Sequence, residues 1–180
     1  KIVMSVAPSN YLSKKNKYTI FPLSSISNSE TINCNENGYY SIYKSDRHGF
    51  NNPDKEWDKK NIEYLLIGDS FTHGNCVNRP HDIGSVLRNL TNKSVLNLGY
   101  EGNNPLLEYA TLREYLKKNT KKVLWIYFES DLIGLRKELK NNYLQKYITD
   151  LNFTQNLKKR HEEIDNEARN KIDEIIEYKF

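Results

Sequence analysis

Three short apolar runs alternate with two helical patterns along the middle of the chain, and this alternation limits the folds open to it. The runs lie at 64–67, 94–98 and 122–128, and between them apolar residues recur at helical spacing over 82–90 and 105–119. Runs of this kind, separated by helices, are typical of a parallel sheet with right-handed crossover connections. We therefore predict an α/β fold for this part of the chain.

A polar turn follows each of the three runs. The first is a Gly-Asp-Ser turn ending at Ser70, the second contains Gly102, and the third contains Ser130-Asp131. In a parallel sheet the ligand crevice lies outside the carboxyl ends of the strands, so we expect the turns to share one edge. At this edge Ser70 would lie beside backbone N–H groups and a helix N-terminus, which can stabilise an oxyanion. The simpler interpretation is a turn with a serine helix cap, which many proteins contain by chance.

Taken together, these turns resemble the SGNH, or GDSL-type, hydrolase family. Its members share a Gly-Asp-Ser serine, a loop glycine, a Gly-x-Asn-Asp segment and a late Asp-x-x-His. The resemblance covers residues 46–131. It identifies Ser70, with Asp69 as a supporting neighbour, as the nucleophile, and Gly102 as the glycine whose N–H helps to form the oxyanion hole. It also implies a three-layer α/β/α sandwich with a parallel sheet, the flavodoxin-like architecture.

The third block of the family is only partly present. Ser130-Asp131 stands where the family has asparagine and aspartate, so either serine replaces the asparagine or the turn is one residue shorter. A serine hydroxyl donates one hydrogen bond and reaches less far than an amide. The resemblance therefore implies Ser130 as a candidate oxyanion donor, with Asp131 in a supporting role.

The fourth block, Asp-x-x-His, does not occur in the sequence. The four histidines are His48, His73, His81 and His161. A serine nucleophile needs a base within hydrogen-bond reach, and His73 lies about one helical turn after Ser70. Neighbouring positions on one helix rarely align serine and histidine, so we expect His73 to line the first turn without acting as the base. We expect the other three histidines to be solvated.

Both ends of the sequence bear on the missing base. The chain starts at Lys1, and a helical pattern over 155–180 runs to its last residue without a stop signal. We interpret the chain as a piece of a longer protein, incomplete at the C-terminus, with the histidine and its aspartate beyond Phe180. On this interpretation the chain alone is inactive.

The first 60 residues differ from the rest in being polar and irregular. A turn signal at 33–38 precedes a short alternating stretch, 39–43, that suits one strand. We expect residues 1–60 to form an extended arm or small antiparallel β lobe packed on the main domain at 61–180. The lobe either shapes the mouth of the site or is a covering hairpin without a ligand role, and the second is the simpler expectation.

Charge and composition exclude some classes of function. The 27 basic and 23 acidic residues give a net charge of +4 and are spread along the chain. The lysine pairs flank apolar elements and do not form a nucleic-acid-binding stripe. No apolar run approaches the length of a membrane span. Cys34 and Cys76 lack metal-ligand spacing, and whether they pair cannot be read from sequence.

The resemblance implies a serine ester hydrolase that acts on an acyl or acetyl ester of a small molecule or glycan and needs no metal or organic cofactor. An O-acetyltransferase uses the same parts, and a non-catalytic module that binds a carbohydrate or a partner is the third possibility. The sequence does not indicate the oligomeric state. It leaves the location open too, and an extracytoplasmic place in a bacterium follows if an upstream signal or anchor has been removed.

Overall fold

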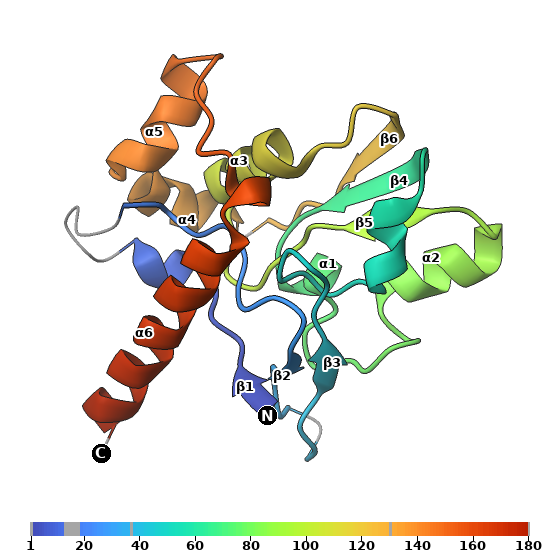
Figure 1. The fold of residues 1–180 in the computed structure, drawn as a ribbon, viewed down its shortest axis with the longest axis horizontal. Helices are drawn as coiled ribbons and strands as arrows, with labels where there is room; N and C mark the ends of the chain where they lie inside the picture. The colour runs from blue at the N-terminus through green and yellow to red at the C-terminus, as the bar shows by residue number, and fades with distance from the viewer. Residues whose placement is uncertain (1, 13–18, 37, 130, 180) are drawn as a thin grey trace.

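The main sheet of the molecule has three parallel strands and lies on one side of it (Figure 1). The computed structural model describes residues 2–12, 19–36, 38–129 and 131–179. The central strand β4 (Ile62–Ile67) lies between β5 (Val95–Asn97) and β6 (Thr120–Trp125), and both neighbours run parallel to it. The predicted α/β class and the parallel sheet are therefore confirmed.

Two helices connect the strands of this sheet, as the sequence predicts. They are α2 (Ile83–Thr91), between β4 and β5, and α3 (Pro105–Tyr115), between β5 and β6. The helix expected over 105–119 ends at Tyr115, where the backbone of Leu116 leaves the helical conformation, and β6 begins at Thr120, which pairs with Ile62. The strand expected over 122–128 ends at Trp125, opposite the last residue of β4.

The rest of the helical structure flanks this unit. A one-turn helix, α1 (Ser70–His73), follows β4, and three helices follow β6, namely α4 (Asp131–Glu138), α5 (Asn142–Thr149) and α6 (His161–Lys179). Short 3-10 turns are η1 (Pro8–Tyr11), η2 (Asp54–Asp58) and η3 (Leu157–Lys159). No helix in the described ranges has both the length and the apolar character needed to cross a bilayer.

The N-terminal residues form a small second sheet. It contains β1 (Ile2–Met4), β2 (Glu30–Ile32) and β3 (Ile42–Lys44) in that order. The expectation of an antiparallel lobe is right for β2 and β3 but wrong for β1, which pairs parallel to β2 because the chain crosses over between them. Figure 1 shows α6 passing beside this lobe, where Asp165 accepts hydrogen bonds from the backbone and hydroxyl of Ser27.

One hydrophobic core joins the lobe to the main sheet. Val6, Tyr11 and Phe21 from the N-terminal residues belong to the same buried cluster as Leu65 of β4 and Leu96 of β5. β6, by contrast, is an edge strand whose side chains are largely exposed. A disulfide between Cys34 and Cys76 adds a covalent link from the loop after β2 to the segment after α1. The sequence had left this pairing open.

Candidate functional site

Ser70 lies where the central strand turns into the first helix. Asp69 caps α1 by accepting a hydrogen bond from the Phe71 backbone N–H at 3.0 Å, and the Ser70 hydroxyl lies 3.5 Å from the other oxygen of the Asp69 carboxylate. Ser70 is partly exposed. The structure thus has the strand-to-helix turn that the sequence predicts, with the serine hydroxyl at the carboxyl edge of the sheet.

Two glycines allow the helix to sit directly over the strand ends. A Cβ atom on Gly68 would lie 2.6 Å from the carbonyl oxygen of Ile126 and would also collide with the Thr72 side chain. A Cβ atom on Gly99 would lie 2.5 Å from Cβ of Thr72. Thr72 therefore fills the space between the ends of β4 and β5, and this packing fixes the position of Ser70.

The turn that contains Gly102 is docked against the Gly-Asp-Ser turn. The Tyr100 N–H donates a hydrogen bond to the Gly68 carbonyl at 3.1 Å, and the Asn103 N–H closes the turn on the Tyr100 carbonyl at 3.2 Å. Gly102 has a φ of +68°, which favours glycine, and a Cβ atom there would lie 2.6 Å from Oγ of Ser9. The structure therefore brings the predicted residues Ser70 and Gly102 to one edge.

The turn after β6 reaches the same edge but is described only in part. The Ile126 N–H donates to the Ile67 carbonyl at 2.8 Å, which continues the sheet for one residue beyond β6. Asp131 is buried and accepts a hydrogen bond from the Phe128 N–H at 2.8 Å, while burial and the charge of Asp69 raise its pKa. Ser130, the candidate oxyanion donor, lies outside the described residues.

Glu108 is a buried carboxyl group near this edge that sequence reasoning missed. Its carboxylate accepts a hydrogen bond from the Trp125 indole N–H at 2.6 Å. Burial raises its pKa to about 7, and the charges of Asp131, Glu138 and Asp69 act in the same direction. The sequence signal that could have identified Glu108 is the presence of a glutamate within the apolar pattern of the helix expected over 105–119.

His73 contacts the lobe and forms no hydrogen bond with Ser70 among the described residues. It is fully buried, its Nε2 lies 3.2 Å from the Tyr43 hydroxyl, and its ring stacks on Tyr100 with centroids 4.5 Å apart. Burial lowers its pKa to about 3. His73 is therefore a neutral ring at the junction of α1, the lobe and the Gly102 turn.

The other histidines are split between interior and surface. The expectation that His48 is solvated is wrong, because its ring packs against Trp57 with centroids 4.5 Å apart, and burial lowers its pKa to about 4. His81 and His161 are exposed, as expected.

Aromatic side chains lie next to Ser70 on an open surface. Phe71 and Phe128 form a ring pair with centroids 5.5 Å apart and are 60% and 50% exposed. Hollows of about 460 and 420 Å³ lie instead at the lobe, where residues such as Val3 and Arg169 line them. A ligand at Ser70 would therefore rest on a surface and not inside either of these hollows.

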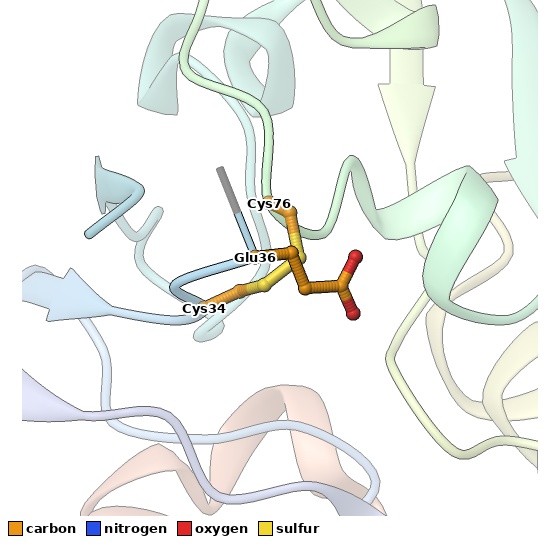
Figure 2. Close-up of side chains that lie close together, drawn as sticks. All are labelled: Cys34, Glu36 and Cys76. Carbon is orange, nitrogen blue, oxygen red and sulfur yellow. A yellow bond between two sulfur atoms is a disulfide. The ribbon is translucent and has the colours of Figure 1, made fainter. Parts of the chain in front are cut away.

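One group of three possible metal ligands occurs within the described ranges. It consists of Cys34, Glu36 and Cys76, with one ligand atom of each within 4.8 Å of the others. Figure 2 shows the Glu36 carboxylate beside the disulfide. Since the two sulfur atoms are bonded to each other, this group offers no thiolate to a metal ion.

No protein-family model, no curated protein and no solved structure matches this chain. The case for a function therefore rests on the residues themselves and on where the fold places them.

Proposed function

We propose that this chain carries the nucleophile side of an SGNH-type serine ester hydrolase, with Ser70 as the nucleophile. The observation that carries the proposal is the 3.1 Å hydrogen bond from Tyr100 to Gly68. This bond docks the turn of the second family block against the turn of the first, as a shared oxyanion site requires. The finer architecture, a three-layer flavodoxin-like sandwich, is part of the same proposal.

In the proposed reaction the Ser70 hydroxyl attacks the carbonyl carbon of an acyl or acetyl ester. The hydroxyl proton passes to a base, and the carbonyl oxygen becomes an oxyanion held by the N–H groups of Ser70 and Gly102. A single donor of this kind is worth about 10²–10³-fold in rate. Collapse of the intermediate expels the alcohol, and water then releases the acid from Ser70. None of these steps needs a metal ion or an organic cofactor.

The proposal requires a base that the described residues do not place at Ser70. A histidine with its aspartate, from outside residues 1–180, would fill this role. Asp69 is a poor substitute because its 3.5 Å separation from the Ser70 hydroxyl is at the limit of a weak hydrogen bond. We assign Asp69 instead to capping α1 and orienting the serine.

The exposed ring pair favours a glycan as the carrier of the ester. Phe71 and Phe128 offer flat apolar faces beside Ser70, and such faces pack well against the apolar faces of sugar rings. The same observation supports the second candidate, a module that binds a glycan without turnover. An O-acetyltransferase would use the same parts with a sugar hydroxyl in place of water.

Ester hydrolysis by the full-length protein tests the proposal. We expect Ser70→Ala to lower the rate with p-nitrophenyl acetate by about 10⁴-fold or more. Ser94→Ala is the matched control, because Ser94 lies at the amino-terminal edge of the same sheet, and its rate should stay within a few-fold of the parent. Equal rates in Ser70→Ala and the parent would refute the hydrolase. Glycan binding without turnover in all three proteins would instead support the binding module.

A further inference from the structure

Helix α4 packs against α3 along one line of its residues (Figure 1). Asp131, Gly134 and Glu138 lie three and four positions apart, so they share one face of the helix. Asp131 and Glu138 are buried, and a Cβ atom on Gly134 would collide with the Asn104 side chain. The Glu138 carboxylate also accepts a hydrogen bond from the Leu106 N–H of α3 at 2.9 Å. This face is therefore the inner one, and the opposite face of α4 is turned to solvent.

The solvent side of α4 combines large apolar side chains with basic ones. Leu132 and Ile133 are 58% and 79% exposed, although aliphatic side chains of this size are usually buried. The Lys140 N–H donates to the Lys137 carbonyl at 3.2 Å, so the helical turn continues past the end of α4. We define the outer face of α4 as five exposed residues, Leu132, Ile133, Arg136, Lys137 and Lys140.

The outer face is positively charged because both acidic residues of α4 point inward. Its three basic side chains form no ion pair with any residue that the structure describes. Glu129 is the one exposed acidic residue among the described part of 127–140. The surface around α4 therefore carries an excess of positive charge beside exposed aliphatic groups.

An aromatic side chain links this surface to the edge of the sheet that carries Ser70. The Phe128 N–H donates to the Asp131 carboxylate at 2.8 Å, and the Asp131 N–H donates to the Phe128 carbonyl at 3.1 Å. These two bonds hold Phe128 at the first turn of α4, and its half-exposed ring pairs with Phe71. Exposed apolar side chains thus occur from the turn at Ser70 to the outer face of α4.

We propose that the outer face of α4 binds the surface of a lipid bilayer that contains anionic lipids. Leu132 and Ile133 enter the boundary between the headgroups and the acyl chains, and the basic side chains face the lipid phosphates. Amphipathic helices that lie in a membrane surface divide their residues in this way. Each basic residue close to an anionic surface strengthens such binding about fivefold. The docking does not depend on the proposed function of Ser70.

The charge and the apolar groups of the outer face together favour lipid over other occupants. A two-fold contact between two copies would set three basic residues against three others, which disfavours it. A nucleic acid would pair with the basic residues but would leave Leu132 and Ile133 in water. An anionic bilayer offers phosphates and hydrocarbon at adjacent depths, so it complements both halves of this face.

Flotation with lipid vesicles tests the proposal on the 180-residue chain. We expect binding to vesicles that contain phosphatidylcholine and phosphatidylglycerol at about two to one, and binding about tenfold weaker or less to phosphatidylcholine alone. Raising the salt concentration from about 0.1 M to about 1 M should weaken the binding, because the Debye length falls from about 10 Å to about 3 Å.

Two variants separate the apolar from the electrostatic part of the contact. Ile133→Glu and the double variant Arg136→Gln/Lys137→Gln should each weaken binding to the anionic vesicles by about tenfold or more. Since the three positions are exposed, the urea midpoints of both variants should equal that of the parent. The matched controls, which should bind within about threefold of the parent, are Ile176→Glu on α6 and Lys121→Gln/Lys122→Gln at the start of β6.

Three results would overturn the proposal. The first is an absence of binding to the anionic vesicles. The second is equal binding by the parent and both α4 variants, since the contact would then lie elsewhere. The third is a parent dimer in sedimentation equilibrium that the α4 variants convert to monomer, because a second copy would then occupy the face. All three leave the role of Ser70 untouched, because that role is judged by ester hydrolysis.

Discussion

At the scale of single residues, the position of Ser70 depends on two glycines that leave room for the Thr72 side chain. Gly68 and Gly99 end neighbouring strands, and Thr72 occupies the space that a larger residue at either position would take. A sequence shows such glycines but not what they contact, because the contact forms only after β4 and β5 pair. The serine and the glycines were therefore predictable from local pattern, whereas Thr72 was not.

Gly99→Ala should destabilise the protein by about 1–3 kcal/mol, the usual cost of overpacking a tight site. The new methyl group would meet the Thr72 side chain at 2.5 Å and the His73 backbone nitrogen at 2.7 Å. Urea unfolding would measure the loss. Adding Thr72→Ala should restore only a small part of it, because alanine removes Cγ2, which lies 2.6 Å from the new methyl group, but keeps Cβ at 2.5 Å. A fully stable single variant would show that α1 does not dock as described.

Glu108 should make the protein less stable as the pH rises from about 4.5 to about 7. Its pKa is raised from 4.5 to about 7 in the folded state, so over this range the folded protein keeps a proton that the unfolded chain has released. The effect is absent below pH 4.5 and complete above pH 7. Glu108→Gln can still accept the Trp125 hydrogen bond, so it should be more stable than the parent at pH 8.

Urea midpoints at pH 4 and pH 8 provide the measurement for Glu108. We expect the fall in midpoint between these values to be smaller in Glu108→Gln than in the parent. Burial also raises the pKa of Asp46, to about 6, and Asp46 is present in both proteins. It therefore contributes the same fall in midpoint to the parent and to the variant. An identical pH dependence in parent and variant would contradict the placement of Glu108 as a buried, proton-holding group.

At the scale of elements, the long-range pairings decided what the sequence could and could not predict. The parallel direction of β4, β5 and β6 followed from the alternation of runs and helical patterns, which is a local signal. The start of β6 was misplaced because the pairing of Thr120 with Ile62 sets it. The parallel pairing of β1 with β2 was missed for the same reason, since neither strand is long or strongly patterned.

The N-terminus of α3 is capped from a distant helix, and this cap should matter for stability. The Glu138 carboxylate accepts hydrogen bonds from the N–H groups of Asn104, Leu106 and Leu107 at 2.9–3.2 Å, while Asn104 itself provides no side-chain cap. Glu138→Ala should therefore cost about 2 kcal/mol or more, because it leaves buried donors unpaired.

Thermal or urea unfolding would measure the cost of Glu138→Ala. Glu162→Ala is the matched control, since Glu162 is exposed in the first turn of α6, and its stability should change by less than about 0.5 kcal/mol. Equal losses in the two variants would mean that the cap of α3 is not Glu138.

At the scale of the whole molecule, the N-terminal residues are more closely involved with the site than the sequence suggested. Ser9 lies against Gly102, and the hydroxyls of Ser5 and Tyr43 lie 3.0 Å and 3.5 Å from the hydroxyl of Tyr100. A covering hairpin without a ligand role was the simpler expectation, and polar, irregular residues gave no sign of these contacts. They arise from tertiary packing, which joins residues 57 to 95 positions apart and leaves no local pattern.

Covalent labelling of the full-length protein by a serine-directed fluorophosphonate tests the central claim most directly. The fluorophosphonate reacts with a serine that a neighbouring base has activated, so labelling reports on the nucleophile and on its base together. We predict one adduct per chain, located by peptide mass spectrometry on Ser70, abolished in Ser70→Ala and retained in Ser94→Ala. An adduct on another residue, or labelling that survives Ser70→Ala, would contradict the account of Ser70 as the nucleophile.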